Sequence, residues 1–541
     1  GLDRNAARSE QSTYYGFYVQ DDWRVTPRLT LNLGLRYEYE GPTTERFNRS
    51  VRRFVENIPN PIEPAAKVNY AAAPIPQISP DNFRVWGGLT FAGVGGEQRT
   101  LWRADRNNWG PRLGVAYSLN SRTVLRGGYV IMFDQLGVNR RSVIQTGFSQ
   151  RTLIVPSLDN GLSFRADLQE PFPDGIQEAP GARLGMRTFL GRGISYFYPE
   201  PQAPRMERWM ASIQRELPGQ VSLEVAYMGN RGTSLETTRD VNPTPREYLS
   251  TAPFRDQAVI DFLTAQVPNP FYGIPDFTGT ALAGRTVQRM QLLRPYPHFG
   301  GAVSAARPLG SSAFHSLQLR SRRRFANGWS YQAAYTWSKL IEADSFLNPT
   351  DGAPHRVISS LDRPQRVALA GIWELPFGKG KRLGGGWRGL PQLLLGGWQL
   401  QGMYNAQSGE ALSFGNVLFL GNIKEIPLPA GQRSLKRWFN TEAGFEKDSR
   451  RQLAFNVRSF PLRLAGVRAP GVHALDLSLV KQLTMRERLR LEIRADLYNA
   501  LNHIDPAAPE TSPTSSLFGQ ITASKREASP RWVWVAAKLS F

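Results

Sequence analysis

The sequence contains no cysteine among its 541 residues, and none of its apolar runs approaches the length of a membrane-spanning helix. Without cysteine there are no disulfides, no thiolate metal sites and no cysteine nucleophile. A spanning helix needs roughly 18 consecutive apolar residues, and stretches such as residues 393–398 are far shorter. Together with a mean hydropathy of -0.37, this excludes a helical membrane protein. A membrane β-barrel is not excluded, because only alternate residues of its strands face lipid and no long apolar run is needed.

Catalytic patterns are also missing, and histidine is scarce. The five histidines are far apart in the sequence, with no H-E-x-x-H motif and no i, i+4 pair that would suit zinc. We expect each to be a polar loop or strand residue: His298, His315, His355, His473 and His503. Asp344, Asp351 and Asp362 share one predicted loop, where adventitious calcium binding stays open. The sequence therefore predicts a protein that is not an enzyme and has no cofactor or resident metal.

The carboxy-terminal segment, residues 531–541, has the clearest strand pattern. Apolar side chains occupy every second position, at Val533, Val535, Ala537 and Leu539, and the segment ends on the aromatic Phe541. A soluble domain rarely ends within a strand, whereas an outer-membrane barrel closes on its last strand. The ending favours a barrel over a soluble sheet.

The same alternation recurs along the chain in segments of about ten residues. In residues 28–39, each odd position is leucine or tyrosine and each even position is polar or glycine. We expect Leu31, Leu33, Leu491 and Ile493 to contact lipid. The predicted strands cover residues 13–23, 28–39, 108–119, 122–133, 207–217, 220–229, 313–325, 329–338, 365–375, 397–406, 471–483, 488–498 and 531–541.

Connections between these segments alternate between short and long. The short ones mostly carry the Pro, Gly or Asn of tight turns, and one longer glycine-rich turn covers residues 376–394. Outer-membrane barrels have short periplasmic turns and long extracellular loops. Counting back from a periplasmic end, the first strand descends from outside, so we expect an all-β, partial antiparallel barrel with about 13 of a probable 22 strands. The predicted extracellular loops are residues 40–107, 134–206, 230–312, 339–364, 407–470 and 501–530.

Several short motifs support a family resemblance. They are YVQDDWR at 18–24, WGPRLGVAY at 109–117, SIQRELPG at 212–219, RPYPHFGG at 294–301, LPFGKGKR at 375–382, LGGWQLQG at 395–402, RWFNTEAG at 437–444 and LYNALNH at 497–503. Together they resemble TonB-dependent outer-membrane receptors of the large Oar-like group. The resemblance covers nearly the whole chain, and its motifs are specific collectively rather than singly. The family's amino-terminal carboxypeptidase-regulatory-like domain, TonB box and plug have no counterpart in this sequence.

The resemblance implies that residues 1–541 are the carboxy-terminal part of a TonB-dependent receptor barrel in the outer membrane of a Gram-negative bacterium. The complete protein would take up a scarce or bulky nutrient with energy from the TonB complex, which would act through the plug region. Its other expected partners are outer-membrane lipids, lipopolysaccharide and the barrel assembly machinery. By the same resemblance, Phe541 with Leu539, Ala537 and Val535 would form the assembly signal.

The formal net charge of +21 raises the question of a nucleic-acid partner. We expect none, because the arginines of the best strands fall on the polar face. The lumen-facing candidates are Arg488, Arg490, Glu492, Arg494 and Asp496. These residues could pair with one another, attract an anionic substrate or contact a plug.

Ligand contacts are expected in the long loops, since specificity usually resides there. The loop candidates are Arg289, Arg294, Tyr296, Arg433, Arg437 and Trp438. Residues 437–444 could instead form a loop scaffold that the family shares whatever its ligand. The substrate itself is not readable. A second function stays open, that of a non-transporting outer-surface or secreted β-rich protein that binds polysaccharide or lipopolysaccharide.

Overall fold

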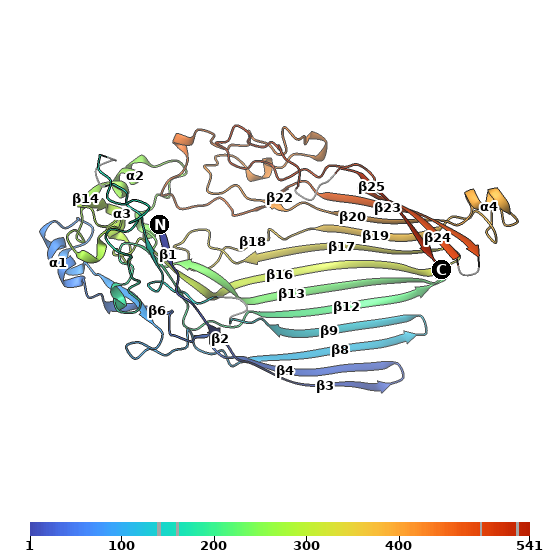
Figure 1. Cartoon of the computed structure of the whole chain (residues 1–541), viewed down its shortest axis with the longest axis horizontal. Coiled ribbons are helices and arrows are strands. Elements are labelled where there is room, and N and C mark those ends of the chain that lie inside the picture. The colour runs from blue at the N-terminus through green and yellow to red at the C-terminus, as the bar shows by residue number, and fades with distance from the viewer. Residues whose placement is uncertain (138–141, 158–161, 487–488, 526–529) are drawn as a thin grey trace.

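The structure, a computed structural model, describes residues 1–137, 142–157, 162–486, 489–525 and 530–541. Its main feature is one large antiparallel sheet (Figure 1). Within the described residues, thirteen strands follow one another across this sheet in the order β25-β24-β23-β20-β19-β17-β16-β13-β12-β9-β8-β4-β3. Their bounds are β3 Tyr14–Thr26, β4 Leu29–Glu40, β8 Asn108–Asn120, β9 Thr123–Phe133, β12 Arg205–Leu217, β13 Val221–Asp240, β16 Gly301–Ala326, β17 Trp329–Ala343, β19 Gln365–Glu374, β20 Trp398–Gln407, β23 Val472–Arg486, β24 Leu489–Tyr498 and β25 Trp532–Ser540.

All thirteen predicted strands are confirmed, and most bounds agree within two residues. The main differences are β13, β16 and β17, which extend beyond the predicted segments at the long-loop end. Register shifts interrupt the β13–β16 pairing beyond Gly232. Ser234 and Ala306 have positive φ angles of 54° and 63° there. Such bulges break the two-residue period, so the pattern did not predict the extensions.

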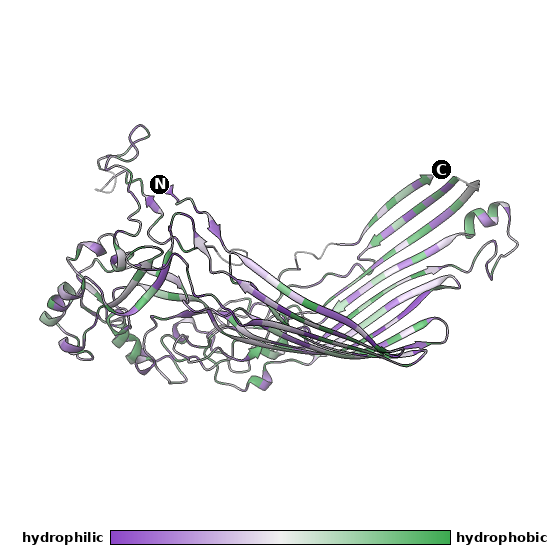
Figure 2. Ribbon diagram, turned by 90° about the horizontal axis from the view of Figure 1, so that it is seen from below, coloured by the Kyte–Doolittle hydropathy of each residue, from purple (hydrophilic) through white to green (hydrophobic). Residues whose placement is uncertain are grey.

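The sheet has one apolar and one polar face, as the alternation predicts. Leu491 is paired with Leu483 and Leu539, whereas Glu492 beside it is paired with Gln482 and Lys538. Figure 2 shows that the sheet is curved rather than flat. Within the described residues, β3 and β25 each pair with one neighbour along the sheet, so the sheet is not closed.

The two ends of the sheet differ in their connections. At one end, tight turns such as residues 121–122 join consecutive strands. At the other end, the long connections fold into a layer of short elements (Figure 1). Its short strands are β1 Leu2–Arg4, β2 Glu10–Gln11, β5 Thr44–Glu45, β6 Val51–Pro59, β7 Trp86–Phe91, β10 Gln150–Thr152, β11 Gly193–Phe197, β14 Gln266–Pro268, β15 Thr286–Gln288, β18 Val357–Ile358, β21 Ala411–Leu412 and β22 Leu464–Arg468.

The described helices are short. The α-helices are α1 Glu63–Ala72, α2 Gln257–Thr264, α3 Arg289–Leu293 and α4 Gly389–Leu395. The 3-10 turns are Pro80–Asn82, Gly185–Arg187, Arg246–Tyr248, Pro275–Phe277, Ile423–Glu425, Ala430–Gln432 and Ser449–Arg451. Among the described residues, no helix has the length and apolar character needed to cross a membrane. The helix α4 lies in the glycine-rich turn at the short-turn end, where the sequence predicted only a turn.

The buried hydrophobic cores belong to the loop layer. The largest core joins the first three long connections through residues such as Phe54, Tyr196, Phe271 and Phe299. A second core joins residues 407–470 to Phe518 of the last connection. The long connections are therefore a folded layer, with more regular structure than their composition predicted.

Local sequence explains how the helices of this layer form. In α2, the Asp256 side chain caps the helix by accepting a hydrogen bond from the Val259 N–H at 3.2 Å. Ile260 and Leu263 then lie on one face and are buried. In α1, a proline occupies the first turn, and Tyr70 stacks on Phe83 with 3.9 Å between ring centroids. These contacts fix the helices to the core of the layer.

Candidate ligand-binding surfaces

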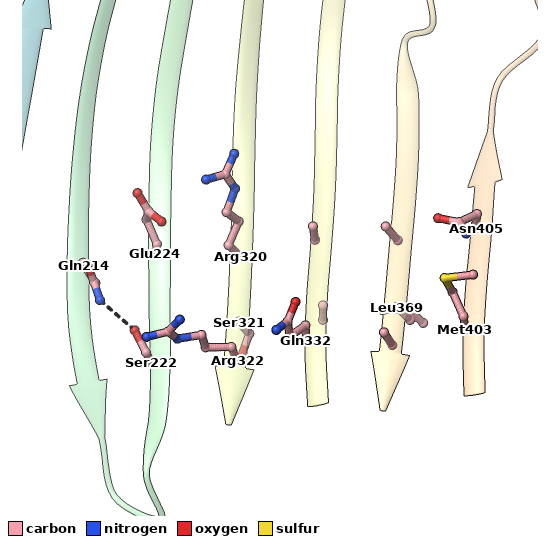
Figure 3. A pocket seen from close by; sticks show the side chains of 14 residues that line it. Gln214, Ser222, Glu224, Arg320, Ser321, Arg322, Gln332, Leu369, Met403 and Asn405 are labelled. Carbon is pink, nitrogen blue, oxygen red and sulfur yellow. Dashed lines mark hydrogen bonds between the residues drawn. The ribbon is translucent and has the colours of Figure 1, made fainter. Parts of the chain in front are cut away.

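The polar face of the sheet contains a hollow with a volume of about 510 Å³. It lies across six neighbouring strands, from β12 to β20 (Figure 3). The small side chains of Ala334, Ala368 and Ala370 make room for it. Its polar lining consists of the side chains of Gln214, Ser222, Glu224, Arg320, Arg322, Gln332 and Asn405. The sequence placed these residues on strands, but the hollow depends on the pairing of strands far apart in the chain.

Hydrogen bonds fix only part of this lining. Gln214 donates to Ser222 Oγ at 3.0 Å and accepts from Arg126 at 2.5 Å. Arg320 donates to Gln318 at 2.8 Å. Within the described part of the chain, Glu224, Arg320 and Arg322 form no ion pair at 4.0 Å or less. The hollow therefore presents two guanidinium groups and one carboxylate to a solute or a protein segment.

The predicted lumen residues of β24 share one face of that strand. Arg494 Nε donates to Asp496 Oδ1 at 2.6 Å, and Arg494 Nη2 donates to Ser478 Oγ at 3.1 Å. Ser478 also donates to Asp496, whose side chain is buried. Arg490 and Glu492 alternate with the apolar residues of the same strand. Arg488 lies outside the described residues. The predicted pairing among the lumen candidates is thus present between Arg494 and Asp496.

The proposed assembly residues lie on β25 and just beyond it. Val535, Ala537 and Leu539 are paired with the apolar residues of β24, from Ala495 to Leu491. Phe541 follows the end of the strand and is 97% exposed. Its role as an assembly signal stays a prediction.

The loop candidates near residue 290 are held by the largest core. The Arg289 guanidinium lies 4.5 Å from the Phe262 ring centroid and donates to the Phe262 carbonyl at 2.9 Å. Arg294 donates to the Gly300 carbonyl at 2.7 Å, and burial lowers its pKa. Tyr296 packs edge-on against Phe54 at 4.7 Å. These three side chains stabilise the layer.

The remaining loop candidates belong to the second core. Trp438 donates from its indole N–H to the Arg468 carbonyl at 2.6 Å and packs against this core. The Arg433 guanidinium lies 5.8 Å from the Trp438 ring centroid. Arg437 is exposed and donates to Asn440 at 3.1 Å. The six candidates are therefore divided between two cores, and Arg437 is the one whose guanidinium is most available to a ligand.

A buried polar cluster in the loop layer was not predicted. Tyr196 on β11 is paired in parallel with Ser304 on β16. The Tyr196 hydroxyl, the Ser304 hydroxyl and Arg307 Nε are all buried, and Ser304 and Arg307 are the hydrogen-bonding neighbours of the Tyr196 hydroxyl. Burial raises the pKa of Tyr196, with a further contribution from the Glu56 charge. The parallel pairing of distant segments brings these groups together, and no local sequence pattern signals it.

The histidines and aspartates that were considered for metal binding have other roles. His298 is fully buried, and its Nε2 lies 3.1 Å from the Gly87 carbonyl oxygen. Burial lowers its pKa to about 4. His473 and His503 are far apart in the sequence, but their rings stack with 3.8 Å between centroids, because β23 lies beside β24, which leads to His503.

Asp351 and Asp362 are likewise engaged by protein donors. Arg246 donates to Asp351 at 2.9 Å, and Arg468 donates to Asp362 at 2.6 Å. In the described ranges, no three His, Asp or Glu side chains are arranged to hold a metal ion.

Comparisons with known proteins agree with the fold. A family model described as "Outer membrane beta barrel domain" matches residues 2–533. A search of curated proteins finds no similar sequence. The ferripyoverdine receptor of the outer membrane of Pseudomonas aeruginosa is 10% identical, with 99% of this chain and 39% of that chain covered and a TM-score of 0.40. The outer membrane transporter YddB from Escherichia coli is 9% identical, with 98% and 55% covered and a TM-score of 0.41.

The siderophore receptor PiuA from Acinetobacter baumannii is also 9% identical, with 98% of this chain and 43% of that chain covered and a TM-score of 0.40. The chain spans about two fifths of the length of the first solved structures that it matches.

Proposed function

Because the chain belongs to the outer membrane β-barrel domain family, we propose that it forms the barrel part of an active transporter in the outer membrane. The complete protein takes up a scarce or bulky nutrient, and the TonB complex supplies the energy through a plug region. Residues 1–541 are the carboxy-terminal part of the barrel in this proposal. The motifs that resemble the Oar-like receptors support it, as does the match of the family model over nearly the whole chain.

The polar face of the sheet is the observation that carries this proposal. In a membrane barrel, the apolar face meets lipid, so the polar face lines the lumen. A wide lumen with a hollow of about 510 Å³, whose guanidinium groups form no ion pair among the described residues, suits contact with a plug or with an anionic solute. Arg490, Glu492, Arg494 and Asp496 extend this polar lining to β24.

The folded loop layer is the second part of the proposed transport route. Long loops of a barrel are extracellular, and here they enclose their own hydrophobic cores. Such a layer holds loop side chains in fixed positions, which favours specific binding over a simple pore. Arg437 is the strongest ligand contact among the six candidates. The other five act mainly as the scaffold that positions the layer.

Uptake by living cells tests the proposal. Cells that express the natural full-length product are compared with cells that lack it, each with and without TonB, and the solutes removed from a complex growth medium are identified by mass spectrometry. We expect at least one solute to be depleted only when both the product and TonB are present.

Two other results would contradict active transport. Depletion that does not depend on TonB would indicate a passive pore. Binding of polysaccharide or lipopolysaccharide to the cell surface, with no depletion of any solute, would favour the non-transporting alternative. Variants that lack residues 241–300, between β13 and β16, or 408–471, between β20 and β23, should assemble but lose uptake, because the loop layer carries the ligand contacts in this proposal.

A further inference from the structure

The turn between β19 and β20 is a folded element at the short-turn end of the sheet. Figure 1 shows its helix, α4, beyond the strand ends. The Gly378 N–H donates to the Leu383 carbonyl at 2.9 Å, and the Lys379 N–H donates to Gln392 Oε1 at 2.6 Å. The Gly396 N–H donates to the Gln392 carbonyl at 3.1 Å. These bonds give residues 376–397 a defined surface, unlike a flexible glycine-rich linker.

That surface is strongly apolar. Leu390 is 70% exposed and Leu394 is 63% exposed. Leu383, Leu393 and Leu395 are also exposed, each to about half of its area or slightly more. Side chains elsewhere in the described residues do not cover this cluster. An exposed group of large apolar side chains indicates an interaction surface.

The turn is attached to the apolar face of the sheet. Trp398 donates from its indole N–H to the Leu394 carbonyl at 2.9 Å. Lys481 donates to the Leu394 carbonyl at 3.3 Å and also to the Gly396 carbonyl. In the sheet register, Trp398 is paired with Lys481, which is paired in turn with Ile493 of the apolar face. The carboxyl end of α4 therefore sits on the lipid-facing side of the barrel.

Aromatic residues mark the depth of this contact. Trp329 and Trp373 are paired on the same face near the short turns, and both are exposed. The Arg323 guanidinium lies 3.8 Å from the Trp329 ring centroid, and Lys481 Nζ lies 5.0 Å from that of Trp398. Tryptophan and snorkelling cations gather where hydrocarbon meets headgroups. The attachment of α4 is thus at the membrane surface.

The charge of the turn is of one sign. Residues 375–409 contain no aspartate or glutamate. Lys381 pairs with Glu374 of β19. Lys379, Arg382 and Arg388 form no ion pair within the described part of the chain. Leucines beside free cations, at the level of the headgroups, are the features of an interfacial anchor for anionic lipid.

We propose that residues 376–397 bind anionic phospholipid of the periplasmic leaflet. The leucines of α4 enter the boundary of the acyl chains, and Lys379, Arg382 and Arg388 bind the phosphates. Lys481 neutralises the carboxyl end of α4 and fixes the helix to the barrel wall. The anchor holds this side of the barrel at a set depth. It rests on membership of the barrel family and on the placement of short turns in the periplasm, and it does not depend on transport.

Fluorescence quenching in lipid nanodiscs tests the anchor, because this chain has no cysteine of its own. A fluorophore is attached to Leu394→Cys in the natural full-length product, and the same label on Ser121→Cys is the control. Ser121 is exposed in the β8–β9 turn at the same end of the sheet. The product without an added cysteine gives the background, and heat-modifiable migration in gels shows that each variant is folded.

We expect brominated phosphatidylcholine to quench the label at residue 394 and aqueous iodide to leave it bright, with the opposite result at residue 121. Brominated phosphatidylglycerol should quench the label at residue 394 more strongly than brominated phosphatidylcholine at the same mole fraction. Replacing Lys379, Arg382 and Arg388 with glutamine should reduce that preference for anionic lipid about fivefold for each cation removed.

Three results would overturn the proposal. Iodide quenching at residue 394 that equals the quenching at residue 121 would place α4 in water. Equal quenching by brominated phosphatidylglycerol and brominated phosphatidylcholine would show that the cations do not select anionic lipid. Protection of residue 394 in cells, without lipid quenching in nanodiscs, would show that a protein covers the leucines.

Discussion

Arginine placed at Leu369 and at Ala370 tests which face of the sheet meets lipid. The two positions are adjacent on β19, so they point to opposite faces. Leu369 is 43% exposed and is paired with Ala333 and Tyr404. Ala370 is paired with Gln332 and Met403 on the polar face, and the strand at both positions borders the hollow. The same new side chain is thus introduced at the same depth on both faces.

The depth of Leu369 sets the expected cost. Trp373, which the anchor proposal places at the membrane surface, lies four residues further along β19. Four residues span about 13 Å along a strand, or about 10 Å of height at a tilt of about 40°. The apolar band of a barrel is about 25 Å tall, so Leu369 lies near its middle. Leu369→Arg should therefore reduce the free energy of unfolding by about 2–4 kcal/mol.

Ala370→Arg should cost less than about 1 kcal/mol, because its guanidinium stays in the water of the hollow. The measurement is equilibrium unfolding of the natural full-length product by guanidinium in phospholipid vesicles, followed by tryptophan emission. Equal costs at the two positions, or a larger cost at Ala370, would mean that the faces are assigned the wrong way round. Leu491 is a weaker test, because it lies two residues from the start of β24 and hence near the membrane surface.

Three further predictions concern the loop layer. Burial gives His298 a pKa of about 4, so between pH 6.5 and pH 4 only the unfolded segment takes up a proton at this histidine. Protection of residues 286–300 from hydrogen exchange should therefore fall as the pH drops through this range. His298→Gln should flatten this pH dependence. Asp362→Asn removes the carboxylate that neutralises the half-buried Arg468 and should cost about 3 kcal/mol of local stability by limited proteolysis. Glu410→Gln at the surface should cost less than about 1 kcal/mol. Trp438→Ala should speed hydrogen exchange in residues 407–470 through loss of about 2–4 kcal/mol of packing. If exchange in this segment is no faster in Trp438→Ala than in Arg437→Ala, a purely structural role for Trp438 is refuted.

The strands were predictable because each one carries its own evidence. A residue on a barrel strand meets either lipid or the lumen, so the two-residue period of residues 28–39 is enough to locate β4. The pairing Arg494–Asp496 follows from the same period, since residues two apart share a face. Where β13 and β16 extend beyond the predicted segments and bulge, the two-residue period ends and the pattern no longer locates the strand.

The loop layer could not be predicted in the same way. Phe271, Phe277 and Phe299 are fully buried in one core, although they occur in irregular segments without a period. Their burial depends on contacts with residues from other loops, such as Phe54. The same reasoning applies to Trp438, which was considered as a ligand contact but packs against its own core. Aromatic and arginine residues serve both binding and packing, so composition alone does not distinguish the two roles.

Lys481 shows how a local exception can reveal tertiary structure. The alternation of β23 places Leu475, Leu477 and Leu479 on the apolar face, which the proposed function places against lipid, and Lys481 is the next residue on that face. A free ammonium group there is costly, so such an exception requires a partner. The structure supplies it in the carbonyl groups at the end of α4, more than 80 residues earlier in the chain. The sequence thus signals that Lys481 needs a partner, and the fold alone identifies the turn that provides it.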